Sequence, residues 1–296
     1  MINGRDRTTL PIGLLAIILL LSLCLAGCGS TTTTAAATTT AAPTTTAEPS
    51  TTTTAAAATT CNVFAAASLS KAFPDIQTAF KKANPQYANV EFVNNFQGTD
   101  ALVAQIEQGA PADVFAAAST KYGKQLADKG LTEAPLNFCQ NKLIVILPAN
   151  NPGGITSLED LVASGKKIAI GSETVPVGTY TRTVLKNLSA SFGADYTDKI
   201  MANVVTQAEK VTAITSSETL GEVDAGFVYV TDATAAKDKV TVLDIPNEFQ
   251  SDPLPTYPIA VVKTNQSGEV AQAFIDFVLG DEGQKILQRY DFLPKP

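Results

Sequence analysis

Ser68 and Lys71 lie three residues apart in the stretch Ala-Ala-Ala-Ser-Leu-Ser-Lys-Ala-Phe. The spacing Ser-x-x-Lys activates a nucleophilic serine in the enzymes that react with penicillin. A serine at the junction of a strand and a helix can instead hold an anion, because the first N–H groups of a helix have no internal partners. The pair therefore fits two kinds of chemistry, covalent hydrolysis and anion binding.

The hydrolase interpretation requires further motifs, a Ser-Asp-Asn-like element and a Lys-Thr-Gly strand. The nearest approach is Lys-Thr-Asn at 263–265, and Ser-Asp-Asn does not occur. The chain has no histidine, which excludes a Ser-His-Asp triad, a Cys-His pair and a zinc site that needs imidazole. A three-residue match arises often by chance, so we predict that the protein is not an enzyme. A Ser68/Lys71 serine hydrolase is kept as the alternative from a different class.

Short apolar runs and amphipathic segments alternate along the chain. The strands and helices that they predict determine where Ser68 and Lys71 lie. The apolar runs predict strands at 63–66, 90–93, 113–117, 143–147, 168–171, 225–230 and 257–262. The periodic segments predict helices at 70–84, 100–108, 120–129, 157–164, 180–191, 211–220, 269–279 and 281–290. This alternation is typical of an α/β fold with largely parallel sheets. In such folds ligands bind at the carboxyl ends of the strands.

Four of the expected junctions before helices share one composition. They span 67–70, 97–100, 175–180 and 209–212, and each places small or hydroxyl side chains where a helix begins. Free N–H groups and the helix dipole make such positions electropositive. If several converge, they bind an anion without arginine or lysine. The alternative for each junction by itself is ordinary helix capping.

The first residues have the features of an export signal. Arg5 and Arg7 precede a leucine-rich run over 10–25, which ends in Leu-Ala-Gly-Cys at 25–28. This ending matches the lipobox of bacterial lipoproteins, so we expect a signal peptide over 1–28 and a lipid on Cys28. The alternative is an uncleaved membrane anchor, since the run is nearly long enough to span a bilayer. Both interpretations place the rest of the chain outside the cytoplasm.

The next segment, 29–60, consists almost entirely of threonine and alanine. Such a segment has no apolar face to bury, and we predict a disordered tether. The folded part then begins at residue 61. The chain carries a net charge of −7, which argues against a nucleic-acid partner because that binding depends on basic patches.

Two cysteines remain after the signal, Cys61 and Cys139. In an oxidising compartment they either form a disulfide or stay as two separate thiols. The sequence leaves both outcomes open.

Several longer stretches resemble one known family. They are Phe-Ala-Ala-Ala-Ser-Leu at 64–69, Gly-Ala-Pro-Ala-Asp-Val-Phe at 109–115, Val-Pro-Val-Gly-Thr-Tyr at 175–180, Gly-Phe-Val-Tyr-Val-Thr-Asp-Ala at 226–233, Tyr-Pro-Ile-Ala-Val-Val at 257–262 and Arg-Tyr-Asp-Phe at 289–292. In this order they resemble the periplasmic molybdate-binding proteins of ABC transporters over 62–293. The resemblance implies a type II periplasmic-binding-protein fold, with two α/β lobes around a central oxyanion cleft. The first lobe would take 61–142 and 250–296, and the second 143–249.

The resemblance also implies a ligand set for the oxyanion. The family's two serines match Ser68 and Thr99, its two backbone N–H donors match Val177 and Val211, and its tyrosine matches Tyr229. These residues would hold the oxyanion of the metal through hydrogen bonds. They fall on the four junctions and at the end of the expected strand 225–230. Thr99 departs from the family's serine by one methyl group but keeps the hydroxyl.

The implied function is capture of molybdate, and of tungstate, for delivery to an ABC transporter permease and its ATPase. The binding protein would be a monomer without a cofactor, anchored by lipid to the outer side of the cell membrane. A pocket of donors alone disfavours phosphate, whose proton would lack an acceptor, provided that Asp100 faces away from the ligand. Sulfate carries no proton, so a binding protein for sulfate or another oxyanion is the alternative within this class.

Overall fold

The computed structural model describes residues 59–263 and 267–296. The expected signal peptide, the lipidated Cys28 and nearly all of the expected tether lie outside the described residues. Thr60, which we placed in the tether, is the first residue of a strand. Across the described ranges, no helix has the length and apolar character needed to cross a bilayer.

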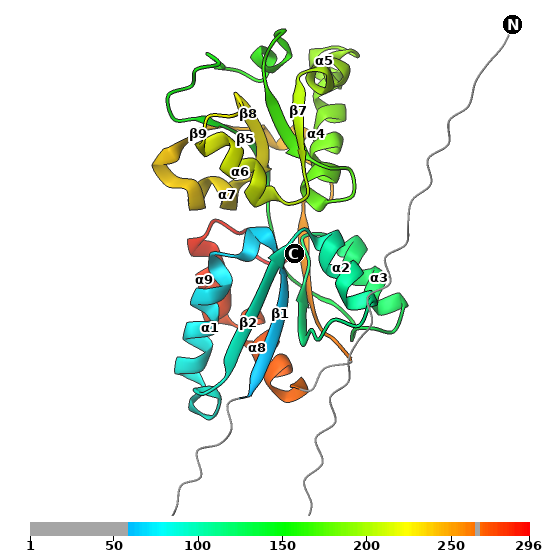
Figure 1. Ribbon diagram of the computed structural model, residues 1–296, viewed down its shortest axis with the longest axis vertical. Helices are drawn as coiled ribbons and strands as arrows, with labels where there is room; N and C mark the ends of the chain where they lie inside the picture. The colour runs from blue at the N-terminus through cyan, green and yellow to red at the C-terminus, as the bar shows by residue number, and fades with distance from the viewer. Residues whose placement is uncertain (1–58, 264–266) are drawn as a thin grey trace, which may run out of the picture. The chain divides into compact units, whose positions relative to one another are not determined.

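Two five-stranded sheets organise the described chain (Figure 1). The first contains β1 (Thr60–Ala66), β2 (Glu91–Gln97), β3 (Val114–Ala116), β4 (Leu136–Gln140) and β10 (Thr256–Val261). The second contains β5 (Leu143–Pro148), β6 (Ile168–Gly171), β7 (Val204–Ala208), β8 (Ala225–Tyr229) and β9 (Val240–Leu243). Their orders are β2-β1-β3-β10-β4 and β7-β6-β8-β5-β9. The chain therefore crosses between the sheets after β4 and returns after β9. We call each sheet with its helices a lobe.

The α/β class is confirmed, but the sheets are not largely parallel. The pairs β1–β2, β1–β3, β6–β7 and β6–β8 are parallel, whereas β3–β10, β4–β10, β5–β8 and β5–β9 are antiparallel. Every antiparallel pair includes β5 or β10. These are the strands that follow the two crossings, and they enter their sheets in the opposite direction to the strands beside them.

Helices cover both faces of the first sheet. On one face pack α1 (Ala72–Ala83), α8 (Gly268–Leu279) and α9 (Asp281–Arg289), and on the other pack α2 (Thr99–Glu107) and α3 (Thr120–Asp128). Side chains of β1 alternate between the two cores, with Val63 and Ala65 in the first and Phe64 in the second. This is the period of two that a buried strand imposes. The second lobe contains α4 (Pro176–Phe192), α5 (Tyr196–Ala202), α6 (Val211–Thr219) and α7 (Val230–Ala236).

The helix after β1 begins later than its sequence pattern predicts. Ala67–Leu69 forms a 3-10 turn, and α1 starts only at Ala72. Phe73 and Phe80 then anchor its buried face, each with its ring edge-on to Phe274 of α8, at centroid distances of 5.9 and 5.7 Å. The late start leaves Ser68 in the turn at the end of β1, outside the helix.

The two cysteines are free and buried, so the disulfide alternative is wrong for this structure. Cys61 lies on β1 and Cys139 on β4, and two strands separate these in the sheet. Three strand spacings amount to about 14 Å, whereas a disulfide requires Cα atoms within about 7 Å. Burial raises the pKa of the Cys61 thiol to about 12 and that of Cys139 well above its usual value. Both residues serve as small apolar groups of the core.

The second lobe buries one carboxyl group without a partner. Glu218 on α6 is fully buried, and neither of its carboxyl oxygens has a hydrogen-bond partner in the structure. Burial, and secondarily the negative charge of Asp224, raises the pKa of Glu218 from 4.5 to about 8. The folded protein thus keeps a proton there that the unfolded chain loses at lower pH.

We expect this proton to make stability depend on pH. Between the two pKa values the folded state binds this additional proton, so Glu218 should lower the free energy of unfolding by up to about 1.4 kcal/mol per pH unit as pH rises from about 5 to about 8. Buried Asp232, whose pKa is raised to about 7, adds to the slope in the same range. Glu218→Gln should flatten this slope in urea unfolding measured across the same range. Glu222→Gln, on the exposed turn just after α6, is the control. An unchanged slope in Glu218→Gln would show that Glu218 is ionised in the folded protein.

Candidate functional site

The carboxyl ends of several strands lead directly into helices or turns. The 3-10 turn follows β1, α2 follows β2 through Gly98, α4 follows β6, α6 follows β7 and α7 follows β8 without a loop. All described residues fall in one compact unit of the chain. The ends of both sheets contribute to one small cavity within it.

The cavity measures about 20 Å³, enough for about one water molecule. All five residues expected as ligands line it, Ser68 and Thr99 from the first lobe and Val177, Val211 and Tyr229 from the second. The other lining residues are Ala66, Ala67, Gln97, Gly98, Ala118, Val175, Pro176 and Lys210. Because the walls come from two lobes, the volume depends on how closely these approach. The lining contains no carboxylate.

Ser68 has a tyrosine as its hydrogen-bond partner. Its Oγ lies 3.0 Å from the hydroxyl of Tyr257 on β10. Lys71 is exposed and lines a neighbouring groove. Within the described chain no hydrogen bond joins Ser68 to Lys71, the residue on which the hydrolase alternative depends. Ser68 pairs with Tyr257 instead.

Three further lining residues stand at helix starts. Thr99 is the first residue of α2, Val177 the second of α4 and Val211 the first of α6. Their N–H groups precede the first intrahelical bonds and are free to meet a ligand. The Thr99 hydroxyl accepts a bond of 3.2 Å from the Ala118 N–H, so its own proton is available for donation.

Tyr229 presents an unpaired donor. It is 1% exposed, and its hydroxyl has no partner among the described residues. Burying such a group unpaired costs about 1–3 kcal/mol. Burial also raises the pKa of the phenol well above its usual value, so it stays protonated at neutral pH. The phenol is a buried donor at a cavity whose lining includes further donors and no carboxylate.

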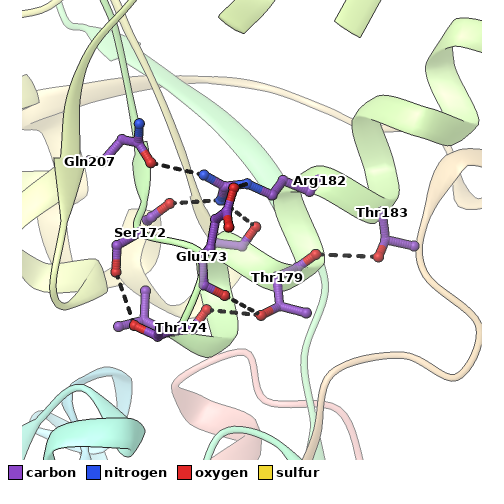
Figure 2. A network of polar contacts seen from close by, with 10 residues as sticks. Ser172, Glu173, Thr174, Thr179, Arg182, Thr183 and Gln207 are labelled. Atoms are coloured by element: carbon purple, nitrogen blue, oxygen red, sulfur yellow. Dashed lines mark hydrogen bonds and ion pairs between the residues drawn. The ribbon is translucent and has the colours of Figure 1, made fainter.

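The turn from β6 into the first residues of α4 is fixed by Arg182 of the same helix (Figure 2). Its guanidinium donates to the carbonyls of Gly171 and Gly178, at 3.0 Å each, and to the side chain of Gln207 at 2.9 Å. Thr179 adds a bond of 3.0 Å to the carbonyl of Glu173. These bonds hold the first turn of α4 against the end of β6, and so set the direction of the Val177 N–H.

Comparison with known proteins identifies the family. Residues 61–293 match the family described as bacterial extracellular solute-binding protein. The chain is 36% identical over 231 residues to the molybdate-binding protein ModA of Mycobacterium tuberculosis, covering 78% of this chain and 83% of that one. The chain belongs to the bacterial extracellular solute-binding proteins. A second relative of this solute-binding protein is ModA of Escherichia coli, 32% identical over 241 residues, 79% of this chain and 88% of that one.

Solved structures of other binding proteins share the fold. The periplasmic molybdate-binding protein of Azotobacter vinelandii superposes with a TM-score of 0.68 at 22% identity, over 80% of this solute-binding protein and 100% of that chain. The sulfate-binding protein SubI of Mycobacterium tuberculosis gives 0.67 at 19% identity, over 80% and 87%. At these identities the likeness concerns the fold alone, and it confirms the expected periplasmic-binding-protein fold with two α/β lobes.

The solute-binding protein turns Asp100 away from the cavity, as expected. Its Oδ2 accepts a bond of 2.9 Å from the Thr174 hydroxyl in the other lobe, and Asp100 is not among the lining residues. The Tyr122 hydroxyl donates to the carbonyl of the same threonine. Asp100 therefore joins the lobes beside the site. Its second oxygen, Oδ1, is buried without a partner among the described residues and lies 2.8 Å from where a Cβ on the lining residue Gly98 would stand.

A wider groove of about 890 Å³ adjoins the cavity and shares Ala67, Ser68 and Lys210 with it. Four lysines line it, with two carboxylates: Lys71, Lys210, Lys237, Lys239, Asp232 and Asp238. This local excess of positive charge attracts anions to the mouth of the site in a protein of negative net charge. This groove could not be predicted from the sequence, because its lysines are scattered along the chain. Among the described residues no group of His, Cys, Asp and Glu could hold a metal cation.

Proposed function

We propose that this solute-binding protein captures molybdate, and tungstate, and delivers it to an ABC transporter permease driven by an ATPase. The observation that carries the proposal is the buried, unpaired hydroxyl of Tyr229 in a cavity lined by helix N-termini. A tetrahedral oxyanion would accept from this phenol, from the hydroxyls of Ser68 and Thr99 and from the N–H groups of Val177 and Val211. No cofactor takes part.

The chemistry of the lining favours an anion without a proton. Molybdate and tungstate are fully deprotonated dianions at neutral pH, so every oxygen can accept. Phosphate retains a proton there, and the donor-rich lining offers that proton no carboxylate. A buried proton without an acceptor costs about 1–3 kcal/mol.

Sulfate is the second candidate, because it is also a bare dianion. Its support is a sulfate-binding neighbour that shares the fold at 19% identity. The relatives named as molybdate-binding proteins share 32–36% identity over more than three quarters of the chain, and they favour molybdate.

We propose binding without catalysis, by closure of the lobes. Ser68 pairs with Tyr257 rather than with Lys71, which speaks for a ligand role over a nucleophilic one. The first lobe would take 61–142 and 250–296, and the second 143–249. A ligand held by both lobes favours their closed arrangement. The protein would act as a monomer outside the cytoplasm, held to the membrane by a lipid on Cys28 and by the tether over 29–60.

Calorimetric titration of the full chain with molybdate, tungstate, sulfate and phosphate tests this proposal. We expect molybdate and tungstate to bind with Kd below about 1 µM, which corresponds to about −8 kcal/mol, and sulfate and phosphate to give no heat at the same concentrations. Equal binding of sulfate would favour the second candidate. Silence from all four anions would contradict an oxyanion site.

A further inference from the structure

Two buried polar side chains lie behind Ser68, outside the lining of the cavity. Tyr257 is fully buried, and its hydroxyl lies 3.0 Å from the Ser68 Oγ. Asn141, also fully buried, follows β4 at the crossing between the lobes, and its Nδ2 lies 3.4 Å from the same hydroxyl. The three side chains form a row that ends at the cavity.

The direction of the hydrogen bonds in this row follows from the neighbours of Asn141. Its Oδ1 lies 2.9 Å from the backbone N–H of Lys142, which can only donate. The amide orientation is thereby fixed, and Nδ2 donates both to the Thr231 hydroxyl at 2.9 Å and to the oxygen of Tyr257. Tyr257 therefore accepts from Asn141.

The proton of Tyr257 then has one acceptor among the described residues, the Oγ of Ser68. If Ser68 donated to Tyr257 instead, the Tyr257 proton would be buried without a partner, at a cost of about 1–3 kcal/mol. With Tyr257 donating, the Ser68 proton is directed elsewhere, and Ser68 lines the cavity. Asn141 thus donates to Tyr257, Tyr257 donates to Ser68, and the Ser68 hydroxyl can donate to an anion in the cavity.

We propose that Tyr257 is a specificity-determining positioning residue, which donates to one lone pair of the Ser68 hydroxyl and so favours Ser68 as a donor to the anion. The inference rests on the proposed function and adds a reason for its selectivity. A serine held as a donor disfavours an anion that carries a proton at that position. Without the Tyr257 hydroxyl, the Ser68 hydroxyl is free to rotate and to accept a proton from hydrogen phosphate.

Tyr257→Phe tests the inference, because it keeps the ring and removes the hydroxyl. On the full chain, molybdate affinity should fall about three- to tenfold, as for one lost neutral hydrogen bond. Inorganic phosphate should compete with molybdate at concentrations where it leaves the wild type unaffected. Tyr196→Phe is the matched control. The buried hydroxyl of Tyr196 donates to the Leu158 carbonyl over 2.6 Å, and neither residue lines the cavity. This control should leave the selectivity between the two anions unchanged.

A mutant cycle separates positioning from a general loss of packing. Because Tyr257 acts through Ser68, Tyr257→Phe should have no effect on either anion in a Ser68→Ala background. If phosphate competes no better in Tyr257→Phe than in the wild type, or if the effect persists without the Ser68 hydroxyl, the inference is overturned. A wild type that does not bind molybdate would instead overturn the proposed function, and the inference with it.

Discussion

Gly98→Ala is expected to lower the affinity for molybdate by about a hundredfold or more, which corresponds to at least about 2.7 kcal/mol. Gly98 caps α2 in the first lobe, and a Cβ at this position would overlap the carbonyl oxygen of Glu209 in the second. It would also lie 2.8 Å from Oδ1 of Asp100, the end of a flexible side chain in the same lobe, and 3.2 Å from Cγ1 of Val175. The added methyl group therefore pushes the lobes apart at the cavity, which weakens the contacts that one anion makes with both.

The same substitution should leave the folding of the first lobe intact. Gly98 has φ −58° and ψ 140°, which alanine adopts without strain. Gly280→Ala is the control, because this glycine also has an ordinary φ of −78° and a Cβ there would come no closer than 3.3 Å to other atoms. Titration calorimetry and the thermal shift caused by molybdate measure the effect. Wild-type affinity in Gly98→Ala would show that binding does not require the lobes to approach this closely.

Tyr229→Phe is expected to weaken molybdate binding by about ten- to a hundredfold. The variant loses a hydrogen bond to a charged ligand, which contributes about 1.5–3 kcal/mol. The ring remains and still packs edge-on against Tyr257, at a centroid distance of 6.2 Å. Titration of both proteins with molybdate measures the loss.

The stability of the ligand-free protein should not suffer from the same substitution. The Tyr229 hydroxyl bonds to no described residue, so its removal should not lower the melting temperature of the ligand-free protein. Tyr196→Phe, which loses its bond to Leu158, should lower the melting temperature and leave binding unchanged. If Tyr229→Phe bound molybdate as the wild type does, the phenol would not be a ligand.

The sequence predicted the central strands of the fold and missed most of its edges. The strands without a prediction were β4, β7 and β9, and each lies at the edge of its sheet. In β7 the side chains of Val204, Thr206 and Ala208 alternate with exposed ones, and Val205 is 58% exposed. A half-exposed strand of mixed composition lacks the continuous apolar run that marks a central strand. The direction of β5 and β10 could not be predicted either, because it depends on the path of the crossings.

The choice of the five expected ligands came from the family resemblance, and all five line one cavity. Four of them belong to junctions, where local sequence determines the start of a helix. Their role as ligands stays a prediction. Tyr257 and Asn141 had no such signal. Tyr257 meets Ser68 across 189 positions of sequence, and Asn141 lies in a crossing whose path only the tertiary structure defines. The pairing of the two cysteines could not be predicted for the same reason. Their spacing along the chain does not reveal that two strands lie between them in the sheet.

Crystals of the protein with bound tungstate offer the most direct test of the site. Anomalous scattering from tungsten locates the metal of the oxyanion without any assumption about its ligands. We predict one strong peak in the cavity between the lobes. The oxygens around this metal should lie within hydrogen-bonding distance of the hydroxyls of Ser68, Thr99 and Tyr229 and of the N–H groups of Val177 and Val211. A peak elsewhere, such as among the lysines of the wider groove, would contradict the proposed site. An empty cavity in crystals that contain tungstate would contradict it as well.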